Sequence, residues 1–142
     1  MSTALEGTNF GIDFNPTADR LRIISDSGQN LRVNVDTGAA TIDSALKNGA
    51  NRAIGVSSAA YTNVDNDPST PTTLFDIDGA NDELLMQAPP NDGVLIPTGK
   101  LGFRGSAVGA FDIWSEIKDG KAVSNRAFAT LDGGAHCLRL IS

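Results

Sequence analysis

Short stretches of alternating apolar and polar residues run along the chain, and a turn follows each of them. The clearest stretches are LRII, LRVNV, TTLFDI, ELLM, AFDIW, RAFATL and CLRLI, and the turns between them include DSG, DTG, DGAND, PPNDG, KDGK and LDGG. Alternation with a period of two is typical of half-buried β-strands. Apolar residues at helical spacing are scarce, and Gly49 interrupts the best window, GAATIDSALKNGANRAI. The pattern therefore predicts an all-β chain with little helix.

Weak internal repeats suggest how the strands are grouped. VNVDTGAATI (33–42) has the same order of apolar, acidic and turn residues as FDIDGANDEL (75–84), and IDF (12–14) resembles FDI (111–113). A period of roughly 40–50 residues with several strands per unit is typical of propeller blades. We therefore expect one repeat domain over residues 1–142, built from about three blade-like antiparallel units near 8–47, 52–102 and 106–142.

Three such units are too few for a closed β-propeller, which typically has about four to eight blades. A partial propeller leaves strand edges and apolar blade faces without a partner. The predicted partners are accordingly further copies of the chain, which would make a homo-oligomer, or other subunits of a complex.

The charge balance argues against nucleic acid as a partner. The 142 residues include 17 acidic and 11 basic side chains, for a net charge of -6, and an acidic surface repels phosphate backbones. No apolar run approaches the roughly 18 residues that a membrane-spanning helix needs, so we expect no membrane insertion.

Calcium is the one metal that the sequence leaves open. Basic residues are absent between Arg52 and Lys100, and this interval contains NVDND and DGAND, which supply Asp65, Asp67, Asp78 and Asp82. Neither segment has the spacing of an EF-hand loop. The alternative is turn chemistry, because Asp and Asn side chains bind their own backbone in turns. No other cofactor is indicated.

Few residues are available for catalysis. The single histidine, His136, is next to the single cysteine, Cys137, and adjacent residues on a strand point to opposite faces. No G-x-S-x-G motif occurs, and we assign no catalytic residue. The first hypothesis is therefore a non-enzymatic protein-interaction or structural subunit. The alternatives are a calcium- or small-ligand-binding module and a saccharide-acting hydrolase or lyase, which would need two carboxylates about 5–10 Å apart.

Five residues are the candidates for a ligand-binding or partner-binding face. Arg32 and Asn34 alternate away from the apolar residues around them, and Asp13 and Asp112 occupy matching repeat positions. Trp114 is the only tryptophan and is a candidate aromatic contact for a partner. The alternative for the two aspartates is structural pairing with Arg20 or Arg126, and for Trp114 it is a place in the core.

The segment GTNFGIDFNPTADRLRIISDSGQNLRVNVDTGAAT resembles the signature of a mostly bacterial family, the domain of unknown function 4394. AAYTN, TTLFDID and PPNDG continue the match in the same order, strongly over residues 5–102 and loosely beyond. The resemblance implies propeller-like repeats without an established activity. Members are often exported, which implies a location outside the cytoplasm, although the chain starts without a signal peptide. The chain looks like a shortened member.

Overall fold

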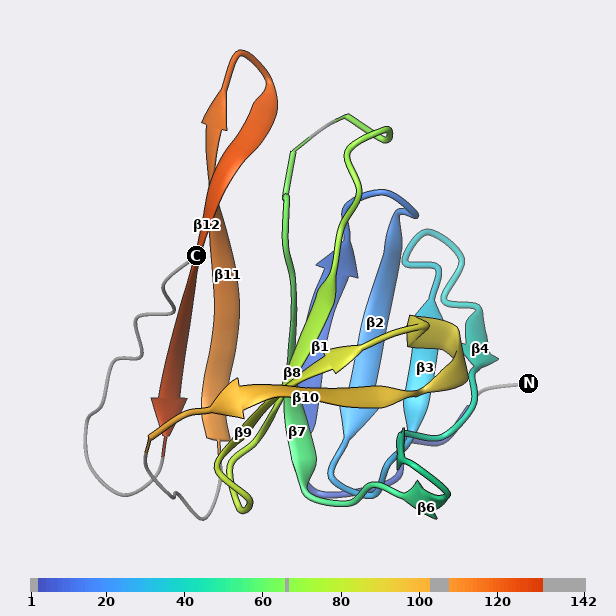
Figure 1. Ribbon diagram of the computed structural model, residues 1–142. Coiled ribbons are helices and arrows are strands. Elements are labelled where there is room, and N and C mark those ends of the chain that lie inside the picture. Colours follow the sequence, from blue (N-terminus) through green and yellow to red (C-terminus); the bar gives the residue numbers. More distant parts are fainter. Residues whose placement is uncertain (1–2, 66, 103–107, 132–142) are drawn as a thin grey trace.

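The chain folds into antiparallel β-sheets with almost no helix (Figure 1). The computed structural model describes residues 3–65, 67–102 and 108–131. The strands are β1 (Phe10–Asn15), β2 (Arg20–Ser25), β3 (Asn30–Val33), β4 (Ala40–Ile42), β5 (Lys47–Asn48), β6 (Asn51–Arg52), β7 (Val56–Tyr61), β8 (Leu74–Asp78), β9 (Glu83–Gln87), β10 (Leu95–Lys100), β11 (Val108–Lys118) and β12 (Lys121–Leu131). Within the described ranges the only helical element is one 3-10 turn, η1 (Pro90–Asp92). The predicted all-β class is confirmed.

Strands that follow one another in sequence pair with one another. The first sheet has the order β1-β2-β3-β4, and the second sheet has the order β10-β9-β8-β7. Strands β11 and β12 form a long hairpin, and β5 and β6 form a very short one. Every one of these pairings is antiparallel. Both larger sheets are therefore simple meanders. Among the described residues, no helix has the length and apolar character needed to cross a membrane.

The turns between strands follow from local side-chain and backbone chemistry. Asp119 and Gly120 join β11 to β12, and both have a positive φ, 51° and 79°. Two such residues in succession match the twist of a tight hairpin. Between β1 and β2, the Asn15 Oδ1 atom accepts hydrogen bonds from the backbone N–H groups of Thr17 and Ala18. These contacts fix the pairing register on both sides of each turn.

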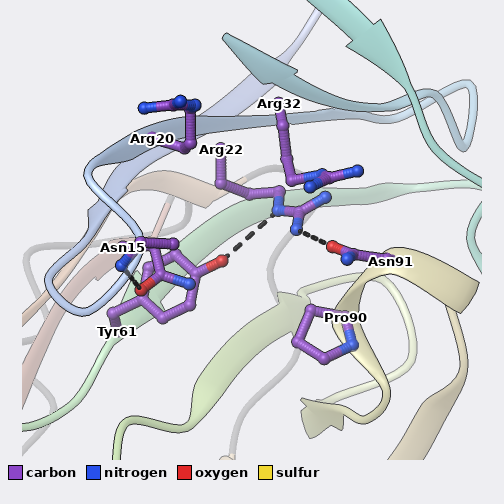
Figure 2. Close-up of a pocket in the computed structure, with 8 residues that line it drawn as sticks. Asn15, Arg20, Arg22, Arg32, Tyr61, Pro90 and Asn91 are labelled. Atoms are coloured by element: carbon purple, nitrogen blue, oxygen red, sulfur yellow. Dashed lines mark hydrogen bonds between the residues drawn. The ribbon is translucent and has the colours of Figure 1, made fainter. Parts of the chain in front are cut away.

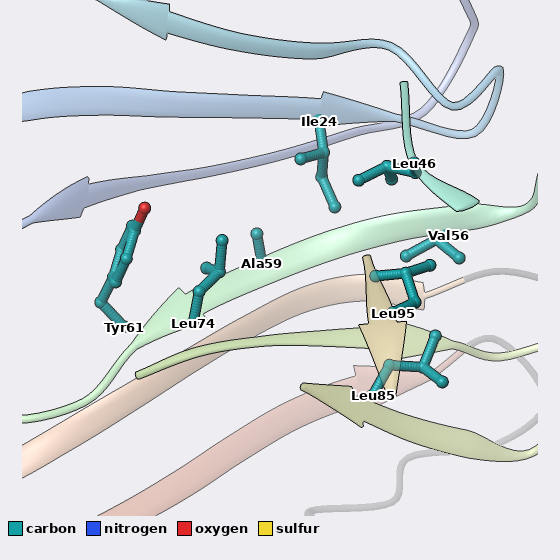
Figure 3. Packing of buried hydrophobic residues seen from close by; sticks show 8 residues of the cluster. All are labelled: Ile24, Leu46, Val56, Ala59, Tyr61, Leu74, Leu85 and Leu95. Carbon is teal, nitrogen blue, oxygen red and sulfur yellow. The ribbon is translucent and has the colours of Figure 1, made fainter. Parts of the chain in front are cut away.

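The two larger sheets and the long hairpin are stacked, with β7 in contact with both β1 and β11. The main core lies mostly between the first and second sheets and consists of Ile24, Leu46, Val56, Ala59, Tyr61, Leu74, Leu85 and Leu95 (Figure 3). The hairpin packs on the other face of the second sheet, through Ile113, Ala127 and Ala129 against Ala60 and Ile77. The second sheet is thus covered on both faces.

Gly11 allows β1 and β7 to approach closely. A Cβ atom at this position would lie 2.6 Å from the Ala59 backbone nitrogen and 2.7 Å from the Ser58 backbone. A side chain at position 11 would therefore have to push two backbones apart. Because position 11 has no side chain, β1 and β7, which are the first strands of the two larger sheets, can lie in close contact.

Candidate functional site

The first sheet carries its apolar side chains on the face that points away from the second sheet. Ile12, Ile23, Leu31 and Ile42 are directly opposite one another across the four strands, and so are Phe14, Leu21, Val33 and Ala40. We call these eight residues the outer face of the first sheet. Ile12 is 55% exposed, Phe14 48% and Ile42 70%, although Leu31 is buried. The exposed apolar side chains of this face are thus concentrated on the two edge strands, β1 and β4.

The opposite face of the same sheet is polar and points towards the second sheet. Asp13 is directly opposite Arg22, which is opposite Arg32, and Asn15 is opposite Arg20. Because side chains alternate along a strand, the sheet places its charged groups between the two layers and most of its apolar groups on the other face. Ile24 is the exception, since it is fully buried in the main core. This arrangement reverses the usual polarity of a sheet that covers a core.

Arg22 is the centre of the polar layer and is only 1% exposed. Its Nη1 atom donates to the Asn30 Oδ1 atom and to the Asp43 Oδ2 atom, each at 2.7 Å. Its Nη2 atom donates to the Asn91 Oδ1 atom at 2.8 Å, and its Nε atom donates to the Tyr61 hydroxyl at 3.3 Å. One guanidinium group therefore connects β2, β3, β7 and the η1 turn.

Asp43 is the carboxylate that two of the arginines share. Its Oδ2 atom lies 2.7 Å from both Arg22 Nη1 and Arg32 Nε, and its Oδ1 atom accepts from Arg32 Nη2 at 2.9 Å. The Asp43 side chain is 5% exposed, whereas that of Arg32 is 35% exposed. The hydrogen bonds that Arg32 donates to Asp43 raise the pKa of Arg32 above its ordinary value. The two-point contact has the geometry that makes arginine–carboxylate pairs strong.

A pocket of about 200 Å³ opens beside this network. Arg20, Arg22 and Arg32 line it from the first sheet, together with Asn15. Tyr61 lines it from β7, and Pro90 and Asn91 line it from the η1 turn (Figure 2). The Arg20 Nη1 atom donates to the Asp19 carbonyl at 2.6 Å. Within the described residues Arg20 forms no ion pair. The pocket thus presents an excess of guanidinium groups.

Asp76, on β8, is a second unusual feature of the space between the sheets. It is fully buried, and neither carboxylate oxygen has a hydrogen-bond partner within the described residues. On the neighbouring strands it is opposite Ala59 and Leu85, both of which belong to the main core. Burial raises its pKa well above the ordinary value, and the charge of Arg22 opposes that effect. The group is therefore neutral over part of the range above its ordinary pKa.

Of the five residues predicted for a binding face, Arg32 is the one that lines this pocket. Asn34 caps the turn after β3, because its Oδ1 atom accepts from the backbone N–H groups of Asp36 and Thr37. Asp13 lies on the inner face, where its oxygens accept from the backbone N–H groups of Tyr61 at 2.6 Å and Phe14 at 2.7 Å. Burial raises the pKa of Asp13, and the charge of Asp112 adds to that effect.

The other two predicted residues lie on the long hairpin. Asp112 is exposed and accepts from the backbone N–H group of Ile113. Trp114 is 50% exposed, and the Arg126 guanidinium carbon lies 5.9 Å from its ring centroid. Within the described ranges, neither Asp13 nor Asp112 forms the ion pair with Arg20 or Arg126 that was the structural alternative. The five residues therefore do not form a single cluster.

The four aspartates considered for calcium have structural partners. Asp65 accepts from the backbone N–H groups of Asp67 and Ala122, the second of which is the main cause of its lowered pKa. Asp67 binds Ser69 and lies 3.7 Å from the Lys121 Nζ atom. Asp78 binds the backbone and side chain of Asn81, and Asp82 has a positive φ of 60° in the same turn. The described part of the chain holds no group of three or more His, Cys, Asp or Glu side chains arranged for a metal.

The network contains residues that the sequence did not single out: Arg22, Asp43, Tyr61 and Asn91. The buried Asp76, which lies outside the network, was not singled out either. A signal for Arg22 was present, because the segments DRLRI and NLRVN place Arg20, Arg22 and Arg32 on the faces opposite their leucines. No local pattern indicates that Asn91 or Tyr61 lies nearby, since both belong to distant segments. His136 and Cys137 lie outside the described residues.

Comparisons with known proteins give one match. The model of the family described as Domain of unknown function (DUF4394) matches residues 1–140. No curated protein matches the chain, and no solved structure matches it.

Proposed function

The chain belongs to the DUF4394 family, and from that premise we propose that it is a non-enzymatic β-repeat domain that assembles with a second copy of itself through the outer face of the first sheet. The exposed apolar side chains of that face, Ile12, Phe14 and Ile42, carry the proposal. The carboxylates of Asp13, Asp65 and Asp78 accept hydrogen bonds from backbone N–H groups of turns and strands, which supports a role without catalysis.

We also propose that the two larger sheets and the long hairpin are blade-like units of a partial propeller. Each of the two larger sheets is an antiparallel meander. The first strands of the three units are in contact, because β1 contacts β7 and β7 contacts β11. In such a stack the second sheet covers one face of the first sheet and one face of the hairpin. The first sheet ends the stack on one side and the hairpin ends it on the other, so one face of each is left uncovered.

The chemistry of the two uncovered faces favours pairing between two first sheets. The eight residues of the outer face of the first sheet include no charged side chain, so two such faces meet without charge repulsion. The exposed face of the hairpin instead carries Asp112, Glu116 and Arg126 beside the aromatic residues Trp114 and Phe128. A face that pairs with itself closes after two copies. A twofold dimer through the first sheet is therefore the expected assembly.

Light scattering coupled to size-exclusion chromatography tests this assembly. We expect the wild-type chain to have the mass of two copies and Phe14→Lys to have the mass of one, because a lysine in the interface brings two unpaired charges together. Val123→Lys is the matched control. Val123 is 53% exposed on the long hairpin, and its replacement should leave two copies together. A monomeric wild-type chain, or equal dissociation by both variants, would contradict the proposal.

A further inference from the structure

We propose that the pocket between the first and second sheets binds an oxyanion, the carboxylate or phosphate group of a small ligand, between Arg20 and Arg22. This site is independent of the proposed assembly, because it lies on the inner side of the first sheet and assembly uses the outer face. Loss of one function would leave the other intact.

The local charge balance is the first argument. Three guanidinium groups line the pocket, and Asp43 is the carboxylate that contacts two of them, Arg22 and Arg32. Asp13, opposite Arg22, accepts hydrogen bonds from backbone N–H groups, and burial favours the neutral form of Asp76. The lining of the pocket itself therefore carries three guanidinium groups and no carboxylate, in a chain whose net charge is -6. An excess of positive charge in a partly enclosed space concentrates anions.

The available donors are the second argument. Four of the five N–H groups of Arg22 are used by Tyr61, Asn30, Asp43 and Asn91, and one Nη2–H remains. Arg20 uses one Nη1–H on the Asp19 carbonyl, and its other N–H groups have no partner within the described residues. The planar guanidinium fork matches the spacing of carboxylate and phosphate oxygens.

Rigidity is the third argument. Arg22 is held from four sides and is only 1% exposed, so it loses little conformational freedom when an anion arrives. Binding sites whose side chains are already ordered retain more of their interaction energy as affinity. Arg20 is half-buried at the edge of the same pocket and supplies the second cation.

The alternative is that Arg22 and Arg32 have only a structural role and connect the sheets. A substitution of Arg20 distinguishes this alternative from anion binding. Its side chain lies outside the network around Asp43 and contacts a backbone carbonyl of its own turn. Arg20→Gln should therefore leave the free energy of unfolding nearly unchanged. A loss of anion binding in this variant would be a loss of the site and not of the fold.

The test is calorimetric titration with inorganic phosphate and, separately, with malonate, each against chloride at equal ionic strength. We expect at least one anion to bind the wild-type chain. Arg20→Gln should lower the affinity for that anion by about tenfold or more, which is the effect of one charge-assisted hydrogen bond. Binding of phosphate alone or of malonate alone identifies the preferred oxyanion. Arg126→Gln removes the same charge on the hairpin and should bind like the wild type.

Arg22 is observed rather than replaced, because its loss would disturb the fold. Its Nε–H resonance in a ¹⁵N-labelled sample should shift on addition of the anion. The proposal is overturned if neither anion binds, if Arg20→Gln binds like the wild type, if Arg126→Gln weakens binding equally, or if the Arg22 resonance does not move.

Discussion

Asp76 and Arg22 are both buried between the sheets, but they differ in how their polar atoms are satisfied. Arg22 has partners for its Nε atom and both Nη atoms. Asp76 has none within the described residues and has apolar neighbours on both flanking strands. A carboxyl group in such a place keeps its proton to a higher pH than it does in the unfolded chain. Its titration therefore affects stability.

We predict that Asp76→Asn increases stability relative to the wild type as the pH rises above the ordinary aspartate pKa. The folded pKa is raised above 3.8, so over that window the unfolded chain is ionised while the folded chain holds the proton. Rising pH then favours the unfolded wild-type chain, whereas the uncharged amide is not affected. Urea unfolding from pH about 4 to about 8 measures the difference.

Asp19→Asn, on the exposed β1–β2 turn, is the control for the removal of one acidic charge. The advantage of Asp76→Asn over the wild type should be smallest near pH 4 and should grow with pH. If the stability of the wild type and of Asp76→Asn changed in parallel with pH, the Asp76 carboxyl would ionise equally in the folded and unfolded chains. That result would contradict the prediction.

Single residues were also the hardest to place from the sequence. Arg32 was identified because it alternates with Leu31 and Val33, and that reasoning concerns only its own strand. Its partner Asp43 lies beyond β4, and Asn91 lies between β9 and β10. Contacts between distant segments depend on how the sheets stack, and alternation within a strand contains no information about stacking.

At the scale of elements, strands in which apolar and polar residues alternate were predictable. The alternating segments LRII, LRVNV, TTLFDI, ELLM, AFDIW and RAFATL correspond to β2, β3, β8, β9, β11 and β12. Strand β7 was missed, because all six residues of VSSAAY are buried and small residues replace the alternation. Strand β10 contains Pro97 and Gly99, which are turn signals when they are read in isolation.

The close approach of β1 and β7 gives a prediction about Gly11. Gly11→Ala places a methyl group 2.6 Å from the Ala59 backbone nitrogen, and backbone atoms on both strands have to move. We expect a loss of about 1–3 kcal/mol in the free energy of unfolding, the usual cost of overpacking. Chemical denaturation followed by circular dichroism measures this loss.

Gly99→Ala is the matched control, because a Cβ atom at Gly99 meets no neighbour within 4 Å. Its free energy of unfolding should stay within about 0.5 kcal/mol of the wild type. If Gly11→Ala were equally harmless, the two strands would not be packed as closely as the structure has them.

At the scale of the whole molecule, alternation does not determine which face of a sheet points inwards. Phe111 and Ile113 on β11 point into the stack and pack against the second sheet. Ile12 and Phe14, which occupy matching positions on β1, point outwards and are 55% and 48% exposed. The same sequence pattern thus contributes to a core in one unit and to an uncovered surface in another.

If that surface is covered by a second copy, the stability of the chain depends on its concentration. Association of folded chains lowers their free energy, and mass action raises the thermal midpoint as the protein is concentrated. We expect the midpoint of the wild type to rise over a hundredfold range of concentration and that of Phe14→Lys to stay constant. Trp114→Ser, on the charged face of the hairpin, should retain the wild-type dependence. A wild-type midpoint that does not change with concentration would leave the outer face without its proposed partner, and loss of the dependence in Trp114→Ser would place the interface on the hairpin instead.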